Sequence, residues 1–547
     1  MHESHRDPLL LPHSPDPARP GSPGPDAAGG GAGPPRRGDS SRVVGPFPSP
    51  GACRARCAWH QRRKAGQPGD RVSGATGRTA AGTAELDWDR ATEEAVEHLR
   101  ALIRIPSVNP PDGGTALAAG RDPHGAETAA AQYCADVLSD AGIEAQVLES
   151  EPGRGSCFAR LPASVSDSEA EPPLVLLSHL DVVPVDGDAW SRDPFGGELV
   201  DGIVWGRGAV DMKDMVAMEL AVMLALSREG GERRRDVIFA AVADEEAGGL
   251  FGARHWVEQR PDLFRGRDGR TAAAALNEVG GYSMTVGSRR VYAVQVAEKG
   301  IIWTRLTATG TTGHGSMPHA DNAAIKLADA VARLAAKAHA PRVTPVVRGF
   351  LASLGLDAVA GAADDGDEER VQLELEHGTP DPVLRRSLNA MLHDTVTPTV
   401  IRVGQKMNVI PGFGQAEVDV RTLPDTDQEA LLAEITQTAG PDVRVEAVLT
   451  MPPVTWPADA EIVGLMEAAL NRADPEGVPA PMMITPGTDA KALALLGIPA
   501  YGFAPLRLDP EMPFLSLFHA HDERVPVSAI RFGLPVLHEV VRNFVAA

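Results

Sequence analysis

The sequence has few cysteines and few aromatic residues. It contains four cysteines in 547 residues, and aromatic residues make up 4% of the chain. Cys53, Cys57, Cys134 and Cys157 lack the spacing of a zinc knuckle with its second cysteine pair. A chain of this length also has no need of a disulfide to stabilise its core. We therefore expect a reduced protein in the cytoplasm.

The sequence also lacks a long apolar run. No apolar run reaches the roughly 18 residues that a bilayer-spanning helix requires. The N-terminal residues show no charged region followed by an apolar stretch, because the short run Leu9–Leu11 ends at Pro12. We expect neither a secretory signal nor a membrane partner.

Charge is distributed unevenly along the chain. Residues 1–82 hold 12 Lys and Arg against 6 Asp and Glu, so the chain's net charge of −22 leaves −28 on the remainder. The same 82 residues contain 13 Pro and 14 Gly, a composition that predicts a disordered extension. The acidic remainder would repel phosphate backbones, which excludes nucleic acid as the main partner.

From residue 83 onward, short apolar runs alternate with helical patterns. Helices are expected over Trp88–Ile105 and Met212–Leu226, where apolar residues recur every three or four positions. The expected strands are Ala145–Leu148, Phe158–Leu161, Leu174–Leu177, Ile203–Trp205, Val237–Val242 and Ala272–Leu276. This alternation favours an α/β fold in which helices cover a sheet.

The pattern changes after about residue 298. A strand at Ile301–Thr309 is followed by a helix at Asn322–Ala338 and then by an acidic stretch at Asp357–Arg370, which we expect to be irregular. The remaining predicted elements are strands at Thr399–Val403 and Gln415–Val420, a helix at Asp427–Thr438 and a strand at Val443–Thr450. This β-α-β-β-α-β order predicts a ferredoxin-like domain. We accordingly divide the chain into an extension (1–82), a catalytic domain in two parts (83–297 and 454–547) and an inserted domain (298–453).

Histidine and acidic residues follow several of the predicted strands. His179, Asp211, Glu246 and Glu278 are separated by 32, 35 and 32 residues, and His519 lies near the C-terminus. The ends of strands are where α/β sheets place their functional sites. Oxygen ligands together with two imidazoles suit a pair of divalent metal ions, zinc first, with one carboxylate bridging the two ions.

Each of these motifs also has a structural interpretation. His179 and Asp181 could form a surface pair, and Asp211 could cap the helix that follows it. Asp244–Glu246 could be a solvated acidic turn, although three adjacent acids repel one another unless a cation neutralises them.

Taken together, the motifs make the sequence resemble a known family. It is similar to the aminoacylase / glutamate carboxypeptidase / succinyl-diaminopimelate desuccinylase superfamily of two-metal hydrolases. The motifs are Ser178–Pro184, Gly206–Asp214, Asp244–Glu246, Asn277–Glu278, Gly313–Ser316 and His519–Glu523, in the family's order. The resemblance implies an α/β fold: a mixed-sheet zinc-peptidase catalytic domain with an inserted ferredoxin-like α+β lid and dimerisation domain.

The resemblance also implies roles for individual residues. Asp181 would orient His179, Asp211 would bridge two ions and precede a cis peptide bond, and Glu245 would be the general base. His314 would stabilise the oxyanion, in many members from the partner subunit. The implied metal ligands are His179, Asp211, Glu246, Glu278 and His519, and the implied substrate-binding residues are Asn408, Arg421, Gly487 and Thr488. The spacing to Glu523 favours His519 over His521 as the ligand.

These implied roles predict a metal-dependent hydrolase that cleaves an amide bond, in a peptide or N-acyl amino acid with a free carboxylate, by Glu-activated water. The cofactors would be two divalent ions, zinc or else cobalt or manganese, and the enzyme would be a homodimer. The alternatives are an N-acyl amino acid deacylase, a non-catalytic module of the same fold and a two-metal phosphoesterase. Many relatives have glycine where this chain has Val279, and the stretch at 356–394 is longer than in a minimal inserted domain. These two departures leave the identity of the substrate undetermined.

Overall fold

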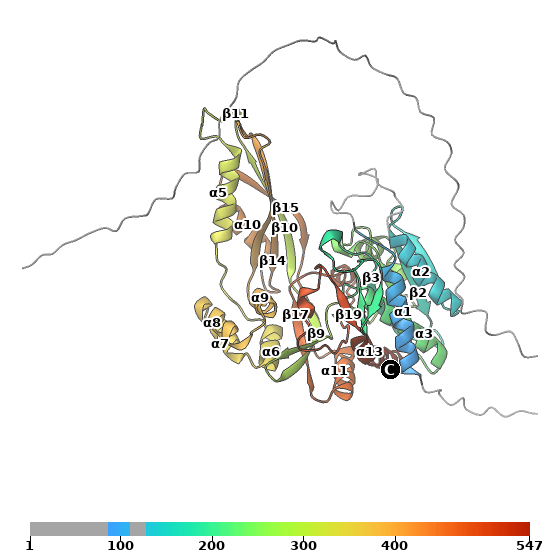
Figure 1. The fold of residues 1–547 in the computed structure, drawn as a ribbon. Coiled ribbons are helices and arrows are strands. Elements are labelled where there is room, and N and C mark those ends of the chain that lie inside the picture. Colours follow the sequence, from blue (N-terminus) through green and yellow to red (C-terminus); the bar gives the residue numbers. More distant parts are fainter. Residues whose placement is uncertain (1–85, 110–126) are drawn as a thin grey trace, which may run out of the picture. The chain divides into compact units, whose positions relative to one another are not determined.

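The computed structural model describes residues 86–109 and 127–547. The predicted extension at 1–82, with Cys53 and Cys57, therefore lies outside the described residues. Within the described residues, the chain forms a large mixed sheet with helices on both faces and a smaller antiparallel sheet with two helices (Figure 1).

A ten-stranded sheet forms the centre of the catalytic part. Its order is β1-β2-β6-β3-β7-β18-β9-β16, with β17 and β8 also paired to β9. These strands are β1 (Glu144–Glu149), β2 (Gly155–Leu161), β3 (Glu171–His179), β6 (Arg235–Val242), β7 (Ala274–Asn277), β8 (Ser283–Val286), β9 (Arg289–Glu298), β16 (Val454–Thr455), β17 (Gly477–Ile484) and β18 (Ala500–Gly502). The central strands β6, β3, β7 and β18 are parallel, which places their carboxyl ends at one edge.

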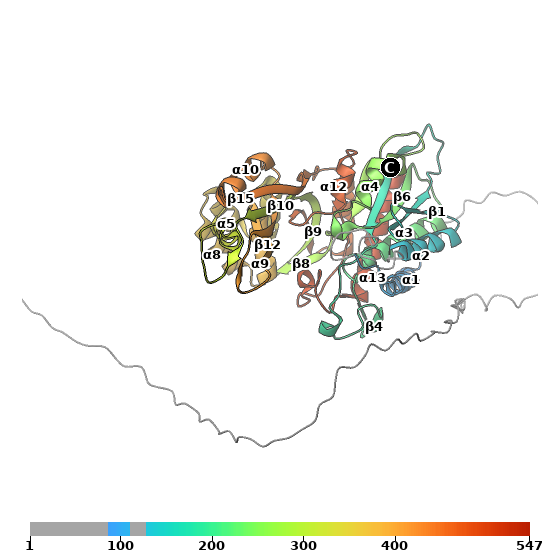
Figure 2. The ribbon, with the colours of Figure 1, turned by 90° about the horizontal axis from the view of Figure 1, so that it is seen from above.

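Side chains of the central strands alternate between two apolar cores. In β3, Leu174 and Leu176 belong to one cluster of buried residues, whereas Val175 and Leu177 belong to another. The first face carries α1 (Trp88–Ile103), α2 (Glu127–Asp140), α3 (Lys213–Glu229) and α13 (Val527–Ala546), and the second carries α4 (Ala253–Gln259) and α12 (Ala490–Ala494) (Figure 2). A strand buried on both faces has a continuous run of apolar residues, which is why β3 could be predicted from the sequence.

Further elements surround this sheet. Helix α11 (Glu461–Ala473) packs against α13 and β17. A small sheet of order β19-β5-β4 joins Arg524–Pro526 to Ile203–Trp205 and Glu198–Val200. No helix among the described residues combines the length and apolar character needed to cross a membrane.

The inserted part contains a four-stranded antiparallel sheet of order β12-β14-β10-β15. Its elements in chain order are β10 (Gly300–Thr309), α5 (Ala323–Ala336), β12 (Thr395–Val403), β14 (Phe413–Thr422), α10 (Gln428–Ala439) and β15 (Val443–Met451). This is the predicted β-α-β-β-α-β order. Helices α5 and α10 pack on the sheet around a separate core that includes Ile302, Leu306 and Val418. We call this unit the lid.

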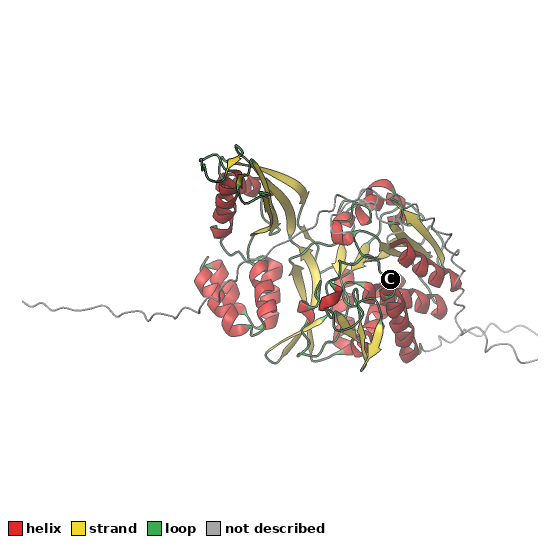
Figure 3. Ribbon diagram, turned by 45° about the horizontal axis from the view of Figure 1, so that its top comes forward, coloured by secondary structure: helices red, strands yellow, loops and turns green. Residues whose placement is uncertain are grey.

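The stretch predicted to be irregular is helical. Asp357–Arg370 includes α7 (Asp357–Asp364) and the start of α8 (Glu368–Gly378), in a run of four helices with α6 (Pro345–Leu354) and α9 (Pro382–Met391) (Figure 3). The prediction was wrong because the acids cap helices or lie on their exposed sides; Asp367, for example, accepts a hydrogen bond from the Arg370 amide. Buried residues of these helices share the core of the catalytic sheet, and α6 packs on β9 and β17.

Candidate metal centre and substrate pocket

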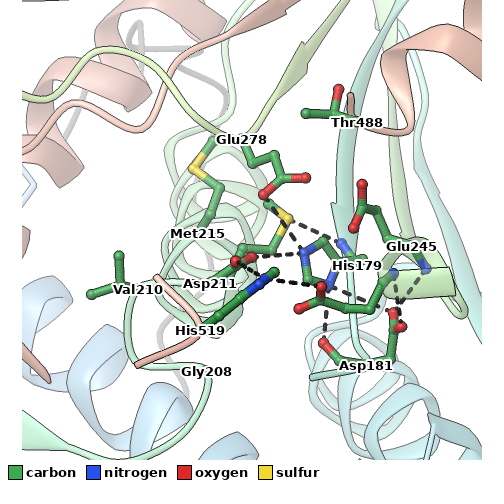
Figure 4. Close-up of polar contacts among 12 residues, drawn as sticks. His179, Asp181, Gly208, Val210, Asp211, Met215, Glu245, Glu278, Thr488 and His519 are labelled. Carbon is green, nitrogen blue, oxygen red and sulfur yellow. Dashed lines mark hydrogen bonds and ion pairs between the residues drawn. The ribbon is translucent and has the colours of Figure 1, made fainter. Parts of the chain in front are cut away.

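Four labelled side chains, His179, Asp211, Glu278 and His519, converge at the carboxyl edge of the catalytic sheet (Figure 4), and Glu246 joins them through its contact with His519. His179 ends β3, and Glu278 directly follows β7. Asp211 lies in the loop before α3, Glu246 lies in the 3-10 turn Glu245–Ala247, and His519 follows the 3-10 turn Phe514–Ser516. Segments far apart in the chain are therefore brought to one point by the parallel strands.

Asp211 lies between the two histidines and presents a different oxygen to each. Its Oδ1 is 3.1 Å from His179 Nε2, and its Oδ2 is 3.2 Å from His519 Nε2. Glu278 Oε2 is 3.6 Å from His179 Nε2, and Glu246 Oε2 is 3.1 Å from His519 Nε2. The structure thus contains two histidine–carboxylate sets that share one aspartate.

These distances fit two metal sites. Donor atoms bound to one zinc ion at ~2.0–2.1 Å in a tetrahedron lie roughly 3.3 Å from one another. His179, Asp211 and Glu246 also offer atoms that lie within 4.8 Å of each other, as do His179, Glu245 and Glu278. In addition, Glu246 Oε1 is buried and has no hydrogen-bond partner among the described residues. Crowded acids with an unpaired oxygen indicate that a cation belongs here.

The electrostatics of the metal-free protein reflect this crowding. Burial and the charge of Asp211 raise the pKa of Glu246 to about 7. Hydrogen bonds that His519 donates to the carboxylates of Asp211 and Glu246 raise its pKa to about 10. Burial opposes protonation of His179, yet Glu278, Asp181 and Asp211 together raise its pKa well above its usual range. Protons therefore occupy positions that suit metal ions, and metal binding must displace them.

Glu245 faces the same cluster. Burial, followed by the charge of Glu278, raises the pKa of Glu245 well above the value of an exposed glutamate. Its side chain is directed toward His179 and Glu278 in Figure 4. A carboxylate in this position can hold a proton near the metal sites without being needed as a bridging ligand.

Asp181 supports both His179 and the turn that carries Glu245. The backbone oxygen of Asp181 is 3.0 Å from His179 Nδ1, and its Oδ1 is more distant, at 3.6 Å. Because a carbonyl oxygen only accepts, neutral His179 keeps its hydrogen on Nδ1 and leaves Nε2 for a metal. The Asp181 carboxylate instead accepts hydrogen bonds from the backbone amides of Glu245 and Glu246, both at 3.1 Å, and from Asn109 Nδ2 at 2.7 Å.

Asp211 does not cap α3. The helix begins at Lys213, its N-cap is Met212, and no side chain caps it. The Asp211–Met212 peptide bond is cis, as the resemblance implied. The Asp211 carboxylate is thereby left to the two histidines, so the helix-capping interpretation was wrong.

Glu523 connects the loop of His519 to the loop of Asp211. Its Oε1 accepts hydrogen bonds from the backbone amides of Val210 at 2.7 Å and Asp211 at 3.0 Å. Its Oε2 accepts from Gly208 N at 3.0 Å and from Arg207 Nη1 at 2.7 Å. Arg207 also donates to the backbone oxygen of His519 at 3.3 Å. Glu523 therefore fixes the positions of two proposed metal ligands, Asp211 and His519, relative to each other. The sequence motif did not reveal this role.

A second buried network lies beneath the Glu245 turn. Arg154 Nη2 contacts Asp244 Oδ1 at 2.5 Å and Glu127 Oε1 at 2.8 Å, and all three side chains are buried. Asp244 Oδ2 also accepts from the Phe251 amide at 2.9 Å. This network could not be predicted from the sequence, because Arg154 and Glu127 belong to no recognisable motif.

A cavity of about 530 Å³ opens beside the metal cluster, between the catalytic sheet and the lid sheet. Arg421 of β14 lines it, and its Nε and Nη2 donate to Asp419 at 2.7 and 3.0 Å. Its Nη1 is buried without a hydrogen-bond partner among the described residues. This unpaired donor matches one oxygen of a carboxylate.

The predicted loop at Gly487 and Thr488 also lines the cavity. A Cβ at Gly487 would lie 2.7 Å from Ile301 Cδ1 and 2.9 Å from Lys491 Cε, so a larger residue would require these two side chains to shift. The Thr488 hydroxyl donates to Glu298 Oε1 at 2.6 Å and accepts from Asn277 Nδ2 at 2.9 Å. Its one hydrogen is therefore used within the protein, and contact with substrate remains a prediction.

Lys491 is a lining residue that the sequence did not suggest. Its Nζ donates to the backbone oxygen of Pro452 at 3.0 Å and lies 3.5 Å from Glu298 Oε2. The only sequence signal is a lysine inside a short, otherwise apolar helix three residues after Thr488. The basic residues that line the cavity are thus Arg254, Arg421 and Lys491.

His314 and Asn408 do not join this cluster within the chain. They lie together at one end of the lid, where Gly315 N donates to the Asn408 backbone oxygen at 2.8 Å and β11 (Gly313–His314) pairs with β13 (Val409–Ile410) (Figure 1). His314 is exposed, and its Nδ1 lies 2.8 Å from Ser316 Oγ. Neither residue lines the cavity.

Other sequence features have structural explanations. Lys213 is buried and donates to the backbone oxygens of Leu102 and Ile105 at 3.0 and 2.9 Å, where α1 ends. Val279 has a φ of 53°, a conformation in which glycine is far less strained than a β-branched residue. His521 packs its ring on Trp190 at 6.5 Å rather than facing the cluster.

Comparison with known proteins agrees with this geometry. Residues 175–543 match the model of peptidase family M20/M25/M40. Aminoacylase-1 of Sus scrofa is 28% identical over 459 residues, covering 82% of this chain and 94% of its own length. The human N-fatty-acyl-amino acid synthase/hydrolase PM20D1 is 28% identical over 391 residues, covering 68% of this chain and 74% of its own.

A solved structure shares the fold. The M20 family metallo-carboxypeptidase Sso-CP2 from Sulfolobus solfataricus superposes with a TM-score of 0.62 at 16% identity, over 82% of this chain and 98% of its own. The fold and the shared-aspartate cluster are those of a metal-dependent α/β hydrolase. The chain belongs to peptidase family M20/M25/M40, and it hydrolyses amide bonds in peptides or N-acyl amino acids.

Proposed function

We propose that this enzyme holds two zinc ions and cleaves N-acyl amino acids or short peptides that carry a free carboxylate. The proposal rests on the Asp211 carboxylate, which directs one oxygen toward His179 and the other toward His519. His179 and Glu278 would hold one ion and Glu246 and His519 the other, and cobalt or manganese would suit the same ligands.

The chain's own residues then perform the proton transfers. When bound, the ions polarise the amide carbonyl and lower the pKa of water to about 7. Glu245 takes the proton of the attacking water and delivers it to the leaving nitrogen. Asp181 keeps the Glu245 turn in place through the two backbone hydrogen bonds.

Two cations would receive the substrate carboxylate. Arg421 offers its unpaired Nη1, and the Lys491 ammonium lies on the same wall. Arg421 is already held by two hydrogen bonds to Asp419, so little side-chain entropy is lost on binding. Carboxylate-bearing substrates also agree with the names of the relatives, which include aminoacylase-1 and a metallo-carboxypeptidase.

His314 and Asn408 would act on the site of a partner subunit in a homodimer. They are held together at the lid end, away from their own chain's cavity. Apolar side chains near them are exposed, including Met407, Val409 and Phe413. A dimer would cover these side chains and bring His314 to the developing oxyanion as a hydrogen-bond donor. The buried free thiols Cys134 and Cys157 suit the reducing cytoplasm that we propose as the location.

The test is a hydrolysis panel on the purified full-length enzyme with zinc, cobalt or manganese. N-acyl amino acids and dipeptides should be cleaved, and their carboxamide counterparts should be cleaved far more slowly. Equal turnover of the carboxylate and carboxamide forms would contradict the proposed substrate class. Release of the free amino acid distinguishes deacylation from cleavage elsewhere in the molecule.

A further inference from the structure

The cavity extends well beyond the metal cluster and the two cations. Its lining includes four methionines and several branched aliphatic residues from both sheets. The methionines are Met284, Met391, Met451 and Met482. Unbranched thioether side chains adapt to flexible apolar ligands better than rigid aromatic walls do.

Helix α9 contributes one side of this apolar wall. Val383, Leu384, Ser387 and Met391 line the cavity, at a spacing that places them on one helix face. The helix has 10 residues and is therefore about 15 Å long. Because α9 lies within the long stretch at 356–394, this wall is formed by the part of the chain that left the substrate open.

The two ends of α9 lie near different parts of the site. At its C-terminal end, the Ala390 and His393 backbone oxygens accept hydrogen bonds from Lys299, in the strand connection next to the lid sheet. Thr395, just beyond, pairs with Arg421. Elsewhere α9 contacts the turn Phe514–Ser516, which precedes His519. Helix α9 therefore contacts both the strand connection beside Arg421 and the turn that precedes His519.

The cavity also has exposed lining residues, which include large apolar side chains as well as Arg254. Trp303 and Leu495 line the cavity and are 36% and 59% exposed. Outside the metal cluster, the acid among the lining residues is Asp489, which is buried. A peptide's free ammonium group would therefore find little exposed negative charge on these walls, whereas an alkyl chain would find apolar side chains from α9 and from both sheets.

We propose that the preferred substrates are N-acyl amino acids with long apolar acyl chains, and that α9 forms the acyl-binding wall. This inference rests on the proposed function, since it assumes that the amide lies at the metal cluster and the carboxylate at Arg421. The acyl chain then extends along Leu384, Ser387 and Met391. Ser387, which is only partly buried, is the position where a larger side chain would obstruct the chain.

The test uses N-acyl amino acids from acetyl to dodecanoyl, kept below their micelle concentrations, with dipeptides alongside. Equilibrium binding is measured on the metal-loaded Glu245→Gln protein, and kcat/KM on the wild-type enzyme. Each buried methylene should tighten binding roughly fourfold. We therefore expect both quantities to improve by at least roughly 100-fold from acetyl to octanoyl.

Variants on α9 locate the acyl chain. Ser387→Trp should weaken binding of dodecanoyl substrates by at least roughly tenfold while leaving acetyl substrates within about threefold. Arg386→Trp is the matched control, because Arg386 is exposed and does not line the cavity. Leu384→Ala should reduce the long-chain preference without adding bulk, which provides a second variant if Ser387→Trp fails to fold.

The outcomes separate this inference from the proposed function. Binding that is independent of chain length, a preference for dipeptides, or equal losses for short and long substrates in Ser387→Trp would overturn the acyl-wall assignment. Hydrolysis of short substrates alone would leave the proposed function intact and contradict this inference. Chain-length-dependent binding without any hydrolysis would retain the acyl wall and contradict the proposed function.

Discussion

The Glu523 carboxylate accepts a hydrogen bond from the backbone amide of Asp211 at 3.0 Å, although the two residues are 312 positions apart. Three further donors, the amides of Gly208 and Val210 and the guanidinium of Arg207, complete its environment. This one side chain therefore fixes the loop of the shared aspartate relative to the segment that carries His519.

Glu523→Gln should weaken metal binding. The amide group would face backbone N–H donors in place of an accepting oxygen, which disturbs the loop of Asp211. We expect the affinity for zinc to fall about 10–100-fold, measured by competition with a chromogenic chelator. Glu511→Gln is the control, because Glu511 is exposed. Unchanged affinity in the Glu523 variant would show that the loops are held by other contacts.

Arg421→Gln should raise KM more than it lowers kcat. A hydrogen bond to a charged group contributes about 1.5–3 kcal/mol, so KM for a carboxylate substrate should rise roughly 10- to 150-fold. The carboxamide form of the same substrate should be little affected. Arg402→Gln tests for a general charge effect, because Arg402 lies on the same lid sheet and its side chain is 75% exposed. An equal loss for both substrate forms would argue against carboxylate recognition.

Mixed dimers should reveal whether His314 acts on the partner's site. His314→Ala and Glu245→Gln homodimers should each be nearly inactive. After subunit exchange, hybrid dimers contain one site with both residues intact, so roughly a quarter of the wild-type activity should return. A mixture that stays inactive despite proven subunit exchange would show that His314 does not act in the active site of the partner subunit.

Metal should stabilise the protein more as pH rises. In the metal-free fold, the pKa of His519 is raised to about 10 from 6.5, so the stabilisation it contributes is complete below pH 6.5 and is lost as pH rises through 10. Glu246, whose pKa is raised to about 7 from 4.5, changes stability in the same direction between those values. Metal ions bound at His519 and Glu246 replace these protons, so the metal-loaded protein does not lose this stability as pH rises.

Thermal unfolding with and without a chelator measures this effect. The Tm difference between metal-loaded and metal-free protein should be larger at about pH 9 than at about pH 6. His519→Gln should reduce the dependence on pH. A Tm difference that shrinks with rising pH would contradict the proton–metal exchange.

Part of the metal cluster could be predicted from the sequence because His179, Glu246 and Glu278 lie at or after the ends of buried parallel strands. Such strands read as apolar runs, and their carboxyl ends meet at one edge. The lid also followed from the β-α-β-β-α-β order of its predicted strands and helices. These features depend on local pattern and on a general rule of sheet topology.

Other features could not be predicted, because they depend on tertiary contacts. The stretch Asp357–Arg370 reads as irregular from its acids and glycines, yet its apolar residues are buried against the catalytic core. Thr488 resembles a substrate ligand, but Glu298 takes its hydroxyl hydrogen. Lys491 and α9 line the cavity only because distant segments fold around it.

The most direct test of the two-metal hydrolase is the Glu245→Gln variant, with metal content and turnover measured on the same preparations. We predict about two zinc ions per chain in both wild type and variant. We predict a loss of kcat on the order of 10²–10⁴-fold in the variant, because the proton acceptor is removed while the ligands remain. Undiminished turnover in the variant, or full activity of wild-type protein that contains no metal, would contradict the central claim.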